Sequence, residues 1–584
     1  MQPSRTRRPA DTLLTTALRA GATPIMVAAG FSLVTNLLYL ALPIFTNQVY
    51  GRVLTSESVP TLIVLATGTI FVFAVSGVID VYRTRVMSDF GVVLDRRVSS
   101  HVFSALFDGV TRREPAAGAQ ALRDLDLFRQ TITGAGLSVL FDLPWAPIYM
   151  AVLFFIDPLI GLVTLFGAAV LCVLALIQAR MSRPPLKAAN DAALRSYGFT
   201  EAGLRNSEVV RAMGMLPDIG LRWSRDRAEC LSQGSLAGRH AEVWGSAIRF
   251  VRMLVQILII AIGAWLIIRG DIGVAMLFAN MILSSRALAP IERGVASWSS
   301  LVSAGQAFER LNILLADYSP VGPQTALPRP KGQLSVEGVN FAAPGGERML
   351  LTALSFQLPA GQFLGVIGPS GAGKSTLARL LVGVWKPLSG AIRLDGADVF
   401  SWPREDFGRH IGYLPQDTEL FSGTVRNNIA RFLPDVTDDE VIAAAHAAGA
   451  HELIVRLPKG YDTEIGTGGA GVVVLSAGQR QRIGLARALL REPAMIVLDE
   501  PNANLDSMGE VALLASLEAM KSRGASIVVV SHKPSMLAAA DRLLVLKEGR
   551  VDLYGPRDLV LEKLNGPKAA VVAPPRAKSL EARA

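Results

Sequence analysis

The residues best suited to chemistry form a glycine-rich run that fits the pattern G-x-x-x-x-G-K-[ST]. Glycines let a backbone wrap closely around phosphate oxygens with its N–H groups pointing inward. Lys374 is expected to reach the terminal phosphates of ATP, and the Ser375 hydroxyl to bind Mg²⁺. Taken alone, the run also fits an ordinary glycine-rich turn. The expected nucleotide-binding residues are Gly368, Pro369, Ser370, Gly371, Ala372, Gly373, Lys374, Ser375 and Thr376.

Two acids end the apolar run Met495-Ile-Val-Leu-Asp-Glu500, and a histidine ends a second apolar run, Val528-Val-Val-Ser-His532. Asp499 is expected to hold Mg²⁺ directly or through water, and Glu500 to polarise the attacking water as general base. A pair of solvated acids is the alternative. A lone histidine at a strand end is more often structural, but its place after the acid pair favours a contact between His532 and the γ-phosphate.

Two further motifs lie between the glycine-rich run and the acids. Gln416 ends Gly412-Tyr-Leu-Pro-Gln416, where its amide could contact both Mg²⁺ and an incoming loop. The stretch Leu475-Ser-Ala-Gly-Gln479 opens a helix. Ser476 and Gly478 are placed there to bind a phosphate through hydroxyl and backbone N–H.

These motifs need a strand before each loop and helices between them. Residues 362–367 read as a buried strand and 377–381 as the following helix. Residues 333–565 alternate strand and helix patterns, which predicts an α/β nucleotide-binding domain. A proline-containing linker is predicted at 319–332, and a disordered tail rich in Ala, Pro and Lys at 566–584.

The N-terminal half reads as a membrane domain, residues 1–318. Half of the 584 residues are hydrophobic, yet the net charge is +9. A nucleic-acid binder would cluster its basic residues, whereas these arginines flank apolar runs, so no nucleic-acid partner is expected. The two cysteines imply neither a disulfide framework nor a metal site.

Six stretches approach the roughly 20 apolar residues that cross a bilayer. Asp142 interrupts the third stretch. The first follows three arginines but is too long for a signal peptide, so we read it as a retained span. The predicted spans are Ile25–Phe45, Val59–Ile79, Leu137–Ile156, Leu159–Ala179, Phe250–Ile268 and Ile272–Ile291.

Arginine-rich segments at 80–136 and 180–245 predict that both long loops and both termini are cytoplasmic. Helical spacing in these loops predicts hairpins that project nearly 40 Å from the bilayer at about 1.5 Å per residue. The turns are expected near Asp124–Phe128 and Arg211–Pro217. Ordinary loops without a coupling role remain the alternative.

Prolines and polar residues within the spans have structural consequences. Pro43, Pro144 and Pro147 should bend or interrupt their helices. Two interpretations of the polar residues remain open: they line a polar cavity, or they bond between helices while Arg286 reaches the interface. These residues are Asn36, Asn47, Gln48, Asn280 and Arg286.

The ordered set of motifs resembles the ATP-binding cassette (ABC) ATPases, and the six-span half resembles an ABC exporter half-transporter. The resemblance assigns the Walker A loop to 368–376, the Q-loop to Gln416, Walker B to Asp499 with catalytic Glu500, and the switch histidine to His532. It assigns the D-loop to Asp506 and the signature to 475–479, including Ser476, Ala477, Gly478 and Gln479. One cassette per chain implies a homodimer with two shared ATP sites.

Several stretches look more specifically like the permease/ATPase of type I protein secretion. They include Gln48–Ser56, Asp142–Pro147, Ala212–Met215, Gly412–Gln416 and Glu500–Asp506. This resemblance implies a bacterial inner-membrane exporter of an unfolded protein with an uncleaved C-terminal signal. Its partners would be a periplasmic membrane-fusion adaptor, an outer-membrane tunnel protein and membrane lipids.

Two other functions are alternatives to protein export. A lipid or drug exporter would use the same ATPase with a more apolar cavity. A regulatory module that only switches on binding ATP would not need the fast turnover that Glu500 and His532 provide. The short N-terminus leaves no room for a peptidase module before the first span.

The chain departs from the family pattern at four places. Ala477 replaces the usual glycine of the signature, which should preserve the helix start with some crowding. Ala343 lies where many exporters stack an aromatic on adenine, and Val472–Val474 lengthens the approach to the signature. Asn502 and Asn504 stand where Thr and Ala are common.

Overall fold

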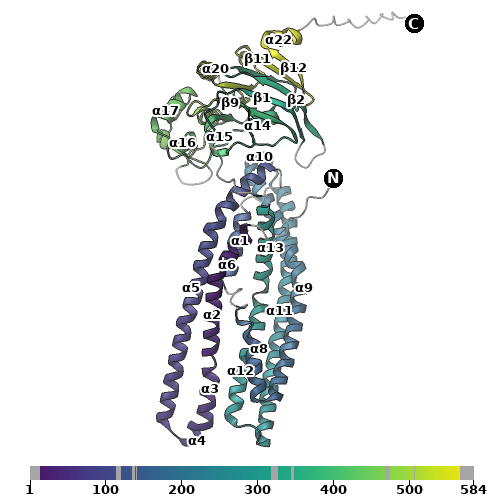
Figure 1. Cartoon of the computed structure of the whole chain (residues 1–584). Helices are drawn as coiled ribbons and strands as arrows, with labels where there is room; N and C mark the ends of the chain where they lie inside the picture. The colour runs from purple at the N-terminus through teal and green to yellow at the C-terminus, as the bar shows by residue number, and fades with distance from the viewer. Residues whose placement is uncertain are drawn as a thin grey trace, which may run out of the picture. The chain divides into compact units, whose positions relative to one another are not determined.

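The computed structural model describes residues 13–112, 120–134, 139, 141–316, 318, 327–342, 348–466, 472–505 and 507–565 (Figure 1). The chain forms two compact units. The first unit comprises Met1–Asp108 and Ala116–Ser319, and the second Gly109–Pro115 and Pro320–Ala584. The domain limits 1–318, 319–332 and 333–565 stay predictions, and the tail 566–584 lies outside the described residues.

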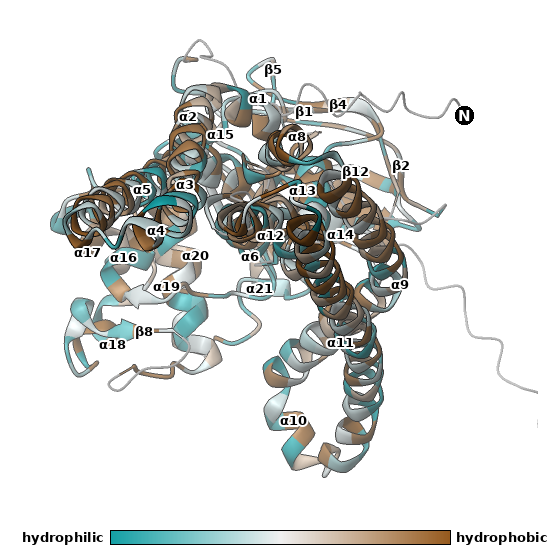
Figure 2. Cartoon of the chain, turned by 90° about the horizontal axis from the view of Figure 1, so that it is seen from below, coloured by the Kyte–Doolittle hydropathy of each residue, from teal (hydrophilic) through white to brown (hydrophobic). Residues whose placement is uncertain are grey.

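The first unit is helical. Its elements are α1 (Leu13–Ala20), α2 (Ala22–Leu38), α3 (Ala41–Gln48), the π-helix Val49–Val53, α4 (Leu54–Ser56), α5 (Val59–Arg112), α6 (Gln120–Thr133), α8 (Trp145–Ile156), α9 (Pro158–Arg205), α10 (Ser207–Ala212), α11 (Leu216–Arg269), α12 (Val274–Ala296) and α13 (Trp298–Ala316). Figure 2 shows long hydrophobic stretches along α5, α9 and α11.

Among the described residues, five helical segments are long and apolar enough to cross a membrane. The third predicted span, Leu137–Ile156, is not confirmed, because α8 has only 12 residues and a crossing needs about 20. The shortening has a local cause, since α8 begins directly after Pro144. The five segments are Ala22–Ser56, Val59–Asp108, Pro158–Arg205, Leu216–Arg269 and Val274–Ala296.

The prolines act as expected. The helix is interrupted between α2 and α3 at Tyr39–Leu40, because Pro43 has no N–H to donate to the Tyr39 carbonyl. Pro144 caps α8, and Pro147 occupies the first turn of that helix, where an intrahelical N–H bond is not needed. The predicted interruptions are therefore confirmed.

One of the two predicted hairpin turns is confirmed. Helix α9 packs along α11, and α10 with the turn Met213–Met215 joins them, as Figure 2 shows. Gly214 has a φ of 64° in that turn, which suits a residue without a side chain.

The first predicted turn is wrong, because Asp124–Phe128 lies within α6. Asp124 is buried and accepts hydrogen bonds from Nε and Nη2 of Arg310 on α13, both at 2.7 Å. A paired carboxylate inside a helix thus produced the polar signal of a turn. Residues 113–119, between α5 and α6, lie outside the described residues.

Asp142 is the centre of a buried polar cluster in the membrane unit. Its carboxylate accepts hydrogen bonds from Ser32 Oγ at 3.0 Å, Asn36 Nδ2 at 3.3 Å and Arg293 Nη1 at 3.0 Å. Asn36 Oδ1 in turn accepts from the Tyr149 hydroxyl at 3.1 Å. For Asn36 the structure therefore supports hydrogen bonding between helices rather than a polar cavity.

The other polar residues of the spans differ in their surroundings. The guanidinium of Arg286 lies 3.8 Å from the centre of the Tyr39 ring, a cation–π contact. Asn47 and Gln48 are half-buried at the end of α3. Asn280 is fully buried, and neither atom of its amide has a hydrogen-bond partner within the described ranges.

The second unit contains mixed sheets with helices around them. A four-stranded antiparallel sheet has the order β2-β1-β4-β5, a six-stranded sheet the order β12-β11-β3-β10-β9-β6, and β7 pairs with β8. The strands are β1 (Leu334–Ala342), β2 (Met349–Leu358), β3 (Phe363–Ile367), β4 (Ser389–Leu394), β5 (Ala397–Asp398), β6 (Ile411–Leu414), β7 (Gly423–Thr424), β8 (Glu464–Ile465), β9 (Met495–Asp499), β10 (Ser526–Val530), β11 (Arg542–Lys547) and β12 (Arg550–Pro556).

The helices of this unit follow the strands in sequence. They are α14 (Lys374–Leu381), α15 (Arg404–His410), α16 (Val425–Ile429), α17 (Asp438–Ala447), α18 (His451–Val455), the 3₁₀ turn Gly460–Asp462, α19 (Ala477–Leu489), α20 (Ser507–Ser522), α21 (Pro534–Ala538) and α22 (Arg557–Asn565). Every residue of β9 and β10 is buried, which is typical of parallel strands covered on both faces. This core fixes the strand ends that carry the site.

Candidate nucleotide-hydrolysis site

Four neighbouring parallel strands deliver the predicted site residues to one edge of the six-stranded sheet. Strand β10 pairs in parallel with β3 and β9, and β9 pairs in parallel with β6. The glycine-rich loop follows β3, Glu500 follows β9, His532 lies two residues beyond β10, and Gln416 two beyond β6. Ligands of such sheets bind at the carboxyl ends of the strands.

The glycine-rich loop has a backbone that side chains would disturb. At Gly368 a Cβ atom would lie 2.2 Å from the carbonyl oxygen of Leu546. Gly373 caps α14 with a φ of 96°, in the left-handed region that favours glycine. Of the remaining loop residues, Pro369, Ser370 and Gly371 are exposed, Ala372 is buried, and Ser375 and Thr376 are half-buried at the start of α14.

Lys374 is buried at the mouth of this loop. Its Nζ donates hydrogen bonds to the carbonyl oxygens of Gly368 at 2.7 Å and Pro369 at 3.0 Å. Burial lowers the pKa of the Lys374 amine, while the nearby carboxylates of Glu500 and Asp499 oppose that shift. The lysine therefore lies close to both acids, within the same loop that would hold phosphates.

Asp499 suits a magnesium ligand. It is only 3% exposed, and its Oδ1 has no hydrogen-bond partner in the described part of the chain. Burial raises the pKa of its carboxyl, and the neighbouring Ser375 hydroxyl partly opposes that shift. A buried carboxylate oxygen with unused lone pairs, beside a serine hydroxyl, matches the oxygen ligands that Mg²⁺ prefers.

Glu500 is held in a strained backbone conformation. Its φ is 51°, and its N–H donates to the carbonyl of Val530 at 2.9 Å. Non-glycine residues in this region are enriched at functional sites. Gln416 is exposed, and its Nε2 donates to Glu500 Oε2 at 3.3 Å. The structure thus brings the Q-loop amide to the proposed general base.

His532 is exposed beyond β10 and has no hydrogen bond to Glu500 among the described residues. The residues on either side of it are anchored. Ser531 Oγ donates to Asn502 Oδ1 at 3.2 Å, and Lys533 Nζ donates to Glu510 Oε2 at 2.7 Å. The side chains on either side of His532 are thus held by hydrogen bonds, while the His532 side chain is exposed.

The signature residues begin α19. Ser476 Oγ accepts from the N–H of Gln479 at 3.3 Å, and Gln479 Oε1 accepts from the N–H of Ser476 at 2.8 Å, which forms a capping box. Ala477 is the first residue of the helix and is exposed, so the helix start tolerates its methyl group. Across the described ranges, no hydrogen bond joins residues 476–479 to residues 368–376.

The approach to the signature contains an isolated bridge between Val473 and Ile465, and Val474 is 87% exposed. Two predicted residues cannot be placed. Asp506 of the D-loop and Ala343, the position opposite adenine, both lie outside the described residues.

Sequence reasoning missed Gln481, which connects the signature helix to the acid strand. Its Nε2 donates to the carbonyls of Glu500 at 3.2 Å and Pro501 at 2.6 Å, and its Oε1 accepts from the N–H of Asn504 at 3.1 Å. Gly478 faces the same segment, because a Cβ there would lie 2.8 Å from the Asn504 carbonyl oxygen. The spacing of three residues between Gly478 and Gln481 places both on one helix face.

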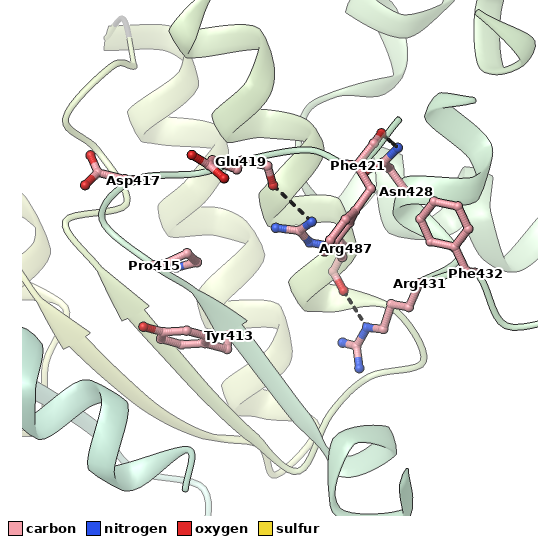
Figure 3. Close-up of a pocket in the computed structure, with 9 residues that line it drawn as sticks. All are labelled: Tyr413, Pro415, Asp417, Glu419, Phe421, Asn428, Arg431, Phe432 and Arg487. Atoms are coloured by element: carbon pink, nitrogen blue, oxygen red, sulfur yellow. Dashed lines mark hydrogen bonds between the residues drawn. The ribbon is translucent and has the colours of Figure 1, made fainter. Parts of the chain in front are cut away.

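A groove of about 410 Å³ opens beside the Q-loop (Figure 3). Arg487 Nη1 donates to the Glu419 carbonyl at 3.2 Å, and Arg431 Nε donates to the Arg487 carbonyl at 2.8 Å. Burial and the charges of Arg487 and Arg491 lower the pKa of Arg431 to about 10. The lining residues are Tyr413, Pro415, Asp417, Glu419, Phe421, Asn428, Arg431, Phe432 and Arg487.

Comparisons with known proteins agree with this geometry. Residues 25–289 match the ABC transporter transmembrane region, and residues 351–503 match the ABC transporter family. The type I secretion system ATP-binding protein PrsD of Rhizobium meliloti (strain 1021) is 40% identical over 538 residues, 92% of each chain. The cyclolysin secretion/processing ATP-binding protein CyaB of Bordetella pertussis (strain Tohama I) is 29% identical over 91% of this chain and 75% of its own length.

A solved structure of a bacterial Atm1-family ABC exporter with ATP bound has the same fold. Its TM-score is 0.81 at 23% identity, over 94% of this chain and 97% of that chain. The fold, the acid pair beside the phosphate loop and the similarity to PrsD agree with one another. The chain therefore belongs to the ABC transporters, as an exporter-type ATPase of the type I secretion group.

Proposed function

We propose that this chain exports an unfolded protein across the bacterial inner membrane as the ATPase of a type I secretion system. The observation that carries this proposal is the 40% identity to PrsD, which extends over 92% of both chains and includes membrane unit and cassette. The assembled site at the ends of β3, β6 and β9 provides the motor.

The residues of the site have separate roles in ATP hydrolysis. The loop 368–376 binds the phosphates through its N–H groups, and Lys374 turns from the loop carbonyls toward the terminal phosphates. Glu500 accepts a proton from the attacking water, oriented by Gln416. His532 contacts the γ-phosphate. Asp499, Ser375 and Gln416 would hold Mg²⁺, which neutralises charge developing on the phosphate oxygens.

The signature is proposed to act on a second chain. Ser476 is exposed, and its hydroxyl oxygen accepts from the N–H of Gln479, which leaves its O–H free to donate to a phosphate. In a homodimer Ser476, Ala477, Gly478 and Gln479 of one chain would close over the phosphate loop of the other, with Asp506 between the sites. Two ATP molecules would then hold the cassettes together.

Coupling to transport is proposed to use the projecting helices. The tip formed by α10 and its following turn exposes Val209, Met213 and Leu216, an apolar surface unusual for a solvated loop. ATP-driven closure would thus move the spans between inward and outward states.

The membrane arrangement follows the same proposal. Six spans per chain, twelve per dimer, place both termini in the cytoplasm, with the α8 segment completing the third crossing. A periplasmic membrane-fusion adaptor and an outer-membrane tunnel protein would continue the path. The cargo would carry an uncleaved C-terminal signal. A lipid or drug exporter remains the second candidate.

The test compares, by mass spectrometry, the proteins secreted by cells with the wild-type chain and with Glu500→Gln. We expect loss of one or a few secreted proteins, restored by the wild-type chain. Matched membrane abundance of both chains is the control. An unchanged secretome, with the cargo genes expressed, would refute protein export and direct the work to lipid and drug transport.

A further inference from the structure

Two neighbouring cavities lie within the membrane unit, and we call the pair the amphipathic cavity. Its apolar part measures about 390 Å³ and its polar part about 540 Å³. Gln178, Val295 and Trp298 line both parts. Each volume falls within the roughly 300–1,000 Å³ typical of small-molecule sites.

Three polar atoms at this cavity lack partners. Gln178 Oε1, Ser182 Oγ and Trp298 Nε1 are buried and have no hydrogen-bond partner among the described residues. Gln178 is 5% and Ser182 6% exposed. Buried polar atoms are nearly always hydrogen-bonded, so three unpartnered ones lining these two neighbouring cavities indicate a guest with polar groups of its own.

The cavity lies at the depth where a lipid changes from acyl chain to headgroup. From Pro158 at the start of α9, Gln178 lies about 30 Å along the helix axis at about 1.5 Å per residue. Val295 lies about 32 Å from Val274 at the start of α12 by the same measure. One hydrocarbon thickness is about 30 Å, so with the starts of α9 and α12 placed at one membrane interface, both residues fall near the other.

The two ends of the cavity differ in character. Leu176, Ile291 and Leu301 line the apolar part. Arg249 and Glu292 line the polar part, where Glu292 pairs with Arg252 and Arg249 donates to Ser246 Oγ at 2.9 Å. The arginines outnumber the carboxylate in this group, which favours an anionic headgroup.

We propose that the amphipathic cavity binds an anionic phospholipid. Its acyl chain lies along Leu176 and Ile291. Its phosphate oxygens accept from Ser182 Oγ and Trp298 Nε1, with Arg249 nearest the charge. A hydroxyl of its headgroup donates to Gln178 Oε1. Such a lipid joins α9 to α12 and α13 as a resident part of the membrane unit, which is a role separate from any transported cargo.

The test uses the purified full-length transporter in detergent, freed of lipid and titrated with dioleoyl phosphatidylglycerol or dioleoyl phosphatidylcholine. Native mass spectrometry should show one phosphatidylglycerol retained per chain. Ala175→Phe fills the apolar part and should lower the affinity for it by roughly tenfold or more. Val173→Phe, on the same helix but exposed outside the cavity, is the matched control and should retain it.

A second variant tests the polar part. Gln178→Leu in an empty cavity would remove an amide whose oxygen has no partner, and the thermal midpoint would then rise or stay constant with or without lipid. With the lipid bound, the variant should lose most of the phosphatidylglycerol-dependent rise in midpoint. This measurement decides the question if Ala175→Phe fails to fold.

Three outcomes overturn the proposal. Equal retention of phosphatidylglycerol by wild type and by both variants excludes the cavity as the site. Equal affinity for phosphatidylcholine excludes an anionic headgroup. A midpoint that rises with a C-terminal cargo peptide, but with neither lipid, assigns the cavity to cargo instead.

Discussion

Gln481→Leu should slow ATP hydrolysis although the side chain of Gln481 reaches Glu500 only through the backbone carbonyl of that residue. The amide is 4% exposed and bonds to three backbone groups, the carbonyls of Glu500 and Pro501 and the N–H of Asn504. Leucine has a similar size but no hydrogen-bonding atoms. The substitution therefore leaves two carbonyls and one N–H without this partner.

The size of the effect follows from these contacts. Each buried group left unpaired costs about 1–3 kcal/mol, and the two carbonyls share one donor, so the loss in unfolding free energy should be about 2–4 kcal/mol. Glu500 already holds a φ of 51°, and a small relaxation of its backbone would move its carboxylate. Displacements near 1 Å can cost roughly 10²-fold in rate, so kcat should fall by about that factor. The KM for ATP should change little, because the phosphate loop is untouched.

The assay is steady-state ATP hydrolysis by the full-length transporter in nanodiscs, at a temperature well below the unfolding midpoint of the variant. Gln357→Leu, the same substitution at an exposed position of β2, is the control. A lowered midpoint with a kcat within about twofold of wild type would show that Gln481 only stabilises the fold. An unchanged kcat and an unchanged midpoint would show that its hydrogen bonds carry little energy.

Three further predictions address the acids and the membrane unit. Glu500→Gln should still bind ATP but lose turnover by roughly 10²–10⁴-fold. Filter binding measures the bound ATP, and phosphate release measures the turnover. Rapid turnover by this variant would show that Glu500 is not the general base. Asp499→Asn should raise the midpoint of the nucleotide-free protein at neutral pH while abolishing Mg²⁺-dependent hydrolysis, because burial raises the pKa of Asp499 and its charge opposes folding above that pKa. The gain should fade in calorimetry as the pH falls through the raised pKa, and a gain independent of pH would contradict this cause. Arg310→Ala should lower the unfolding free energy of the membrane unit by roughly 2–3 kcal/mol, a value reduced for the partial exposure of Arg310. Adding Asp124→Ala to the same chain should recover part of this loss. If the losses from the two substitutions simply add, the ion pair contributes nothing.

The sequence was informative wherever a signal is local. The turn after α10 falls within the predicted stretch Arg211–Pro217, which contains a glycine that permits a positive φ and a proline in the first turn of the next helix. The phosphate loop was found in the same way, because a strand, a glycine run and a helix follow one another without interruption. Strands β9 and β10, which lead into Asp499 and His532, are also apolar runs in the sequence.

Long-range partners explain what the sequence could not supply. Asp124 resembled a turn residue, yet its charge is compensated by Arg310, 186 positions away. Asp142 interrupts the apolar run of the third predicted span. Its carboxylate accepts hydrogen bonds from Ser32, Asn36 and Arg293, which lie on other helices. For Gln481, the only indication in the sequence was its spacing of three residues from Gly478, which places both on one helix face. No pattern within a window of one helix contains these pairings.

Asn280 shows how the structure can restrict an interpretation that the sequence left open. Bonding between helices and a polar cavity were equally compatible with its position in an apolar span. Its amide is fully buried, but neither amide atom has a partner among the described residues of this chain. An unpaired amide in an apolar span costs roughly 2–7 kcal/mol, depending on the reference state for its transfer out of water. A cost of this size implies that a further group forms hydrogen bonds with the Asn280 amide. Because Asn280 is already 0% exposed within one chain, its amide can be paired only by an enclosed water or by a rearrangement of the helices packed around it.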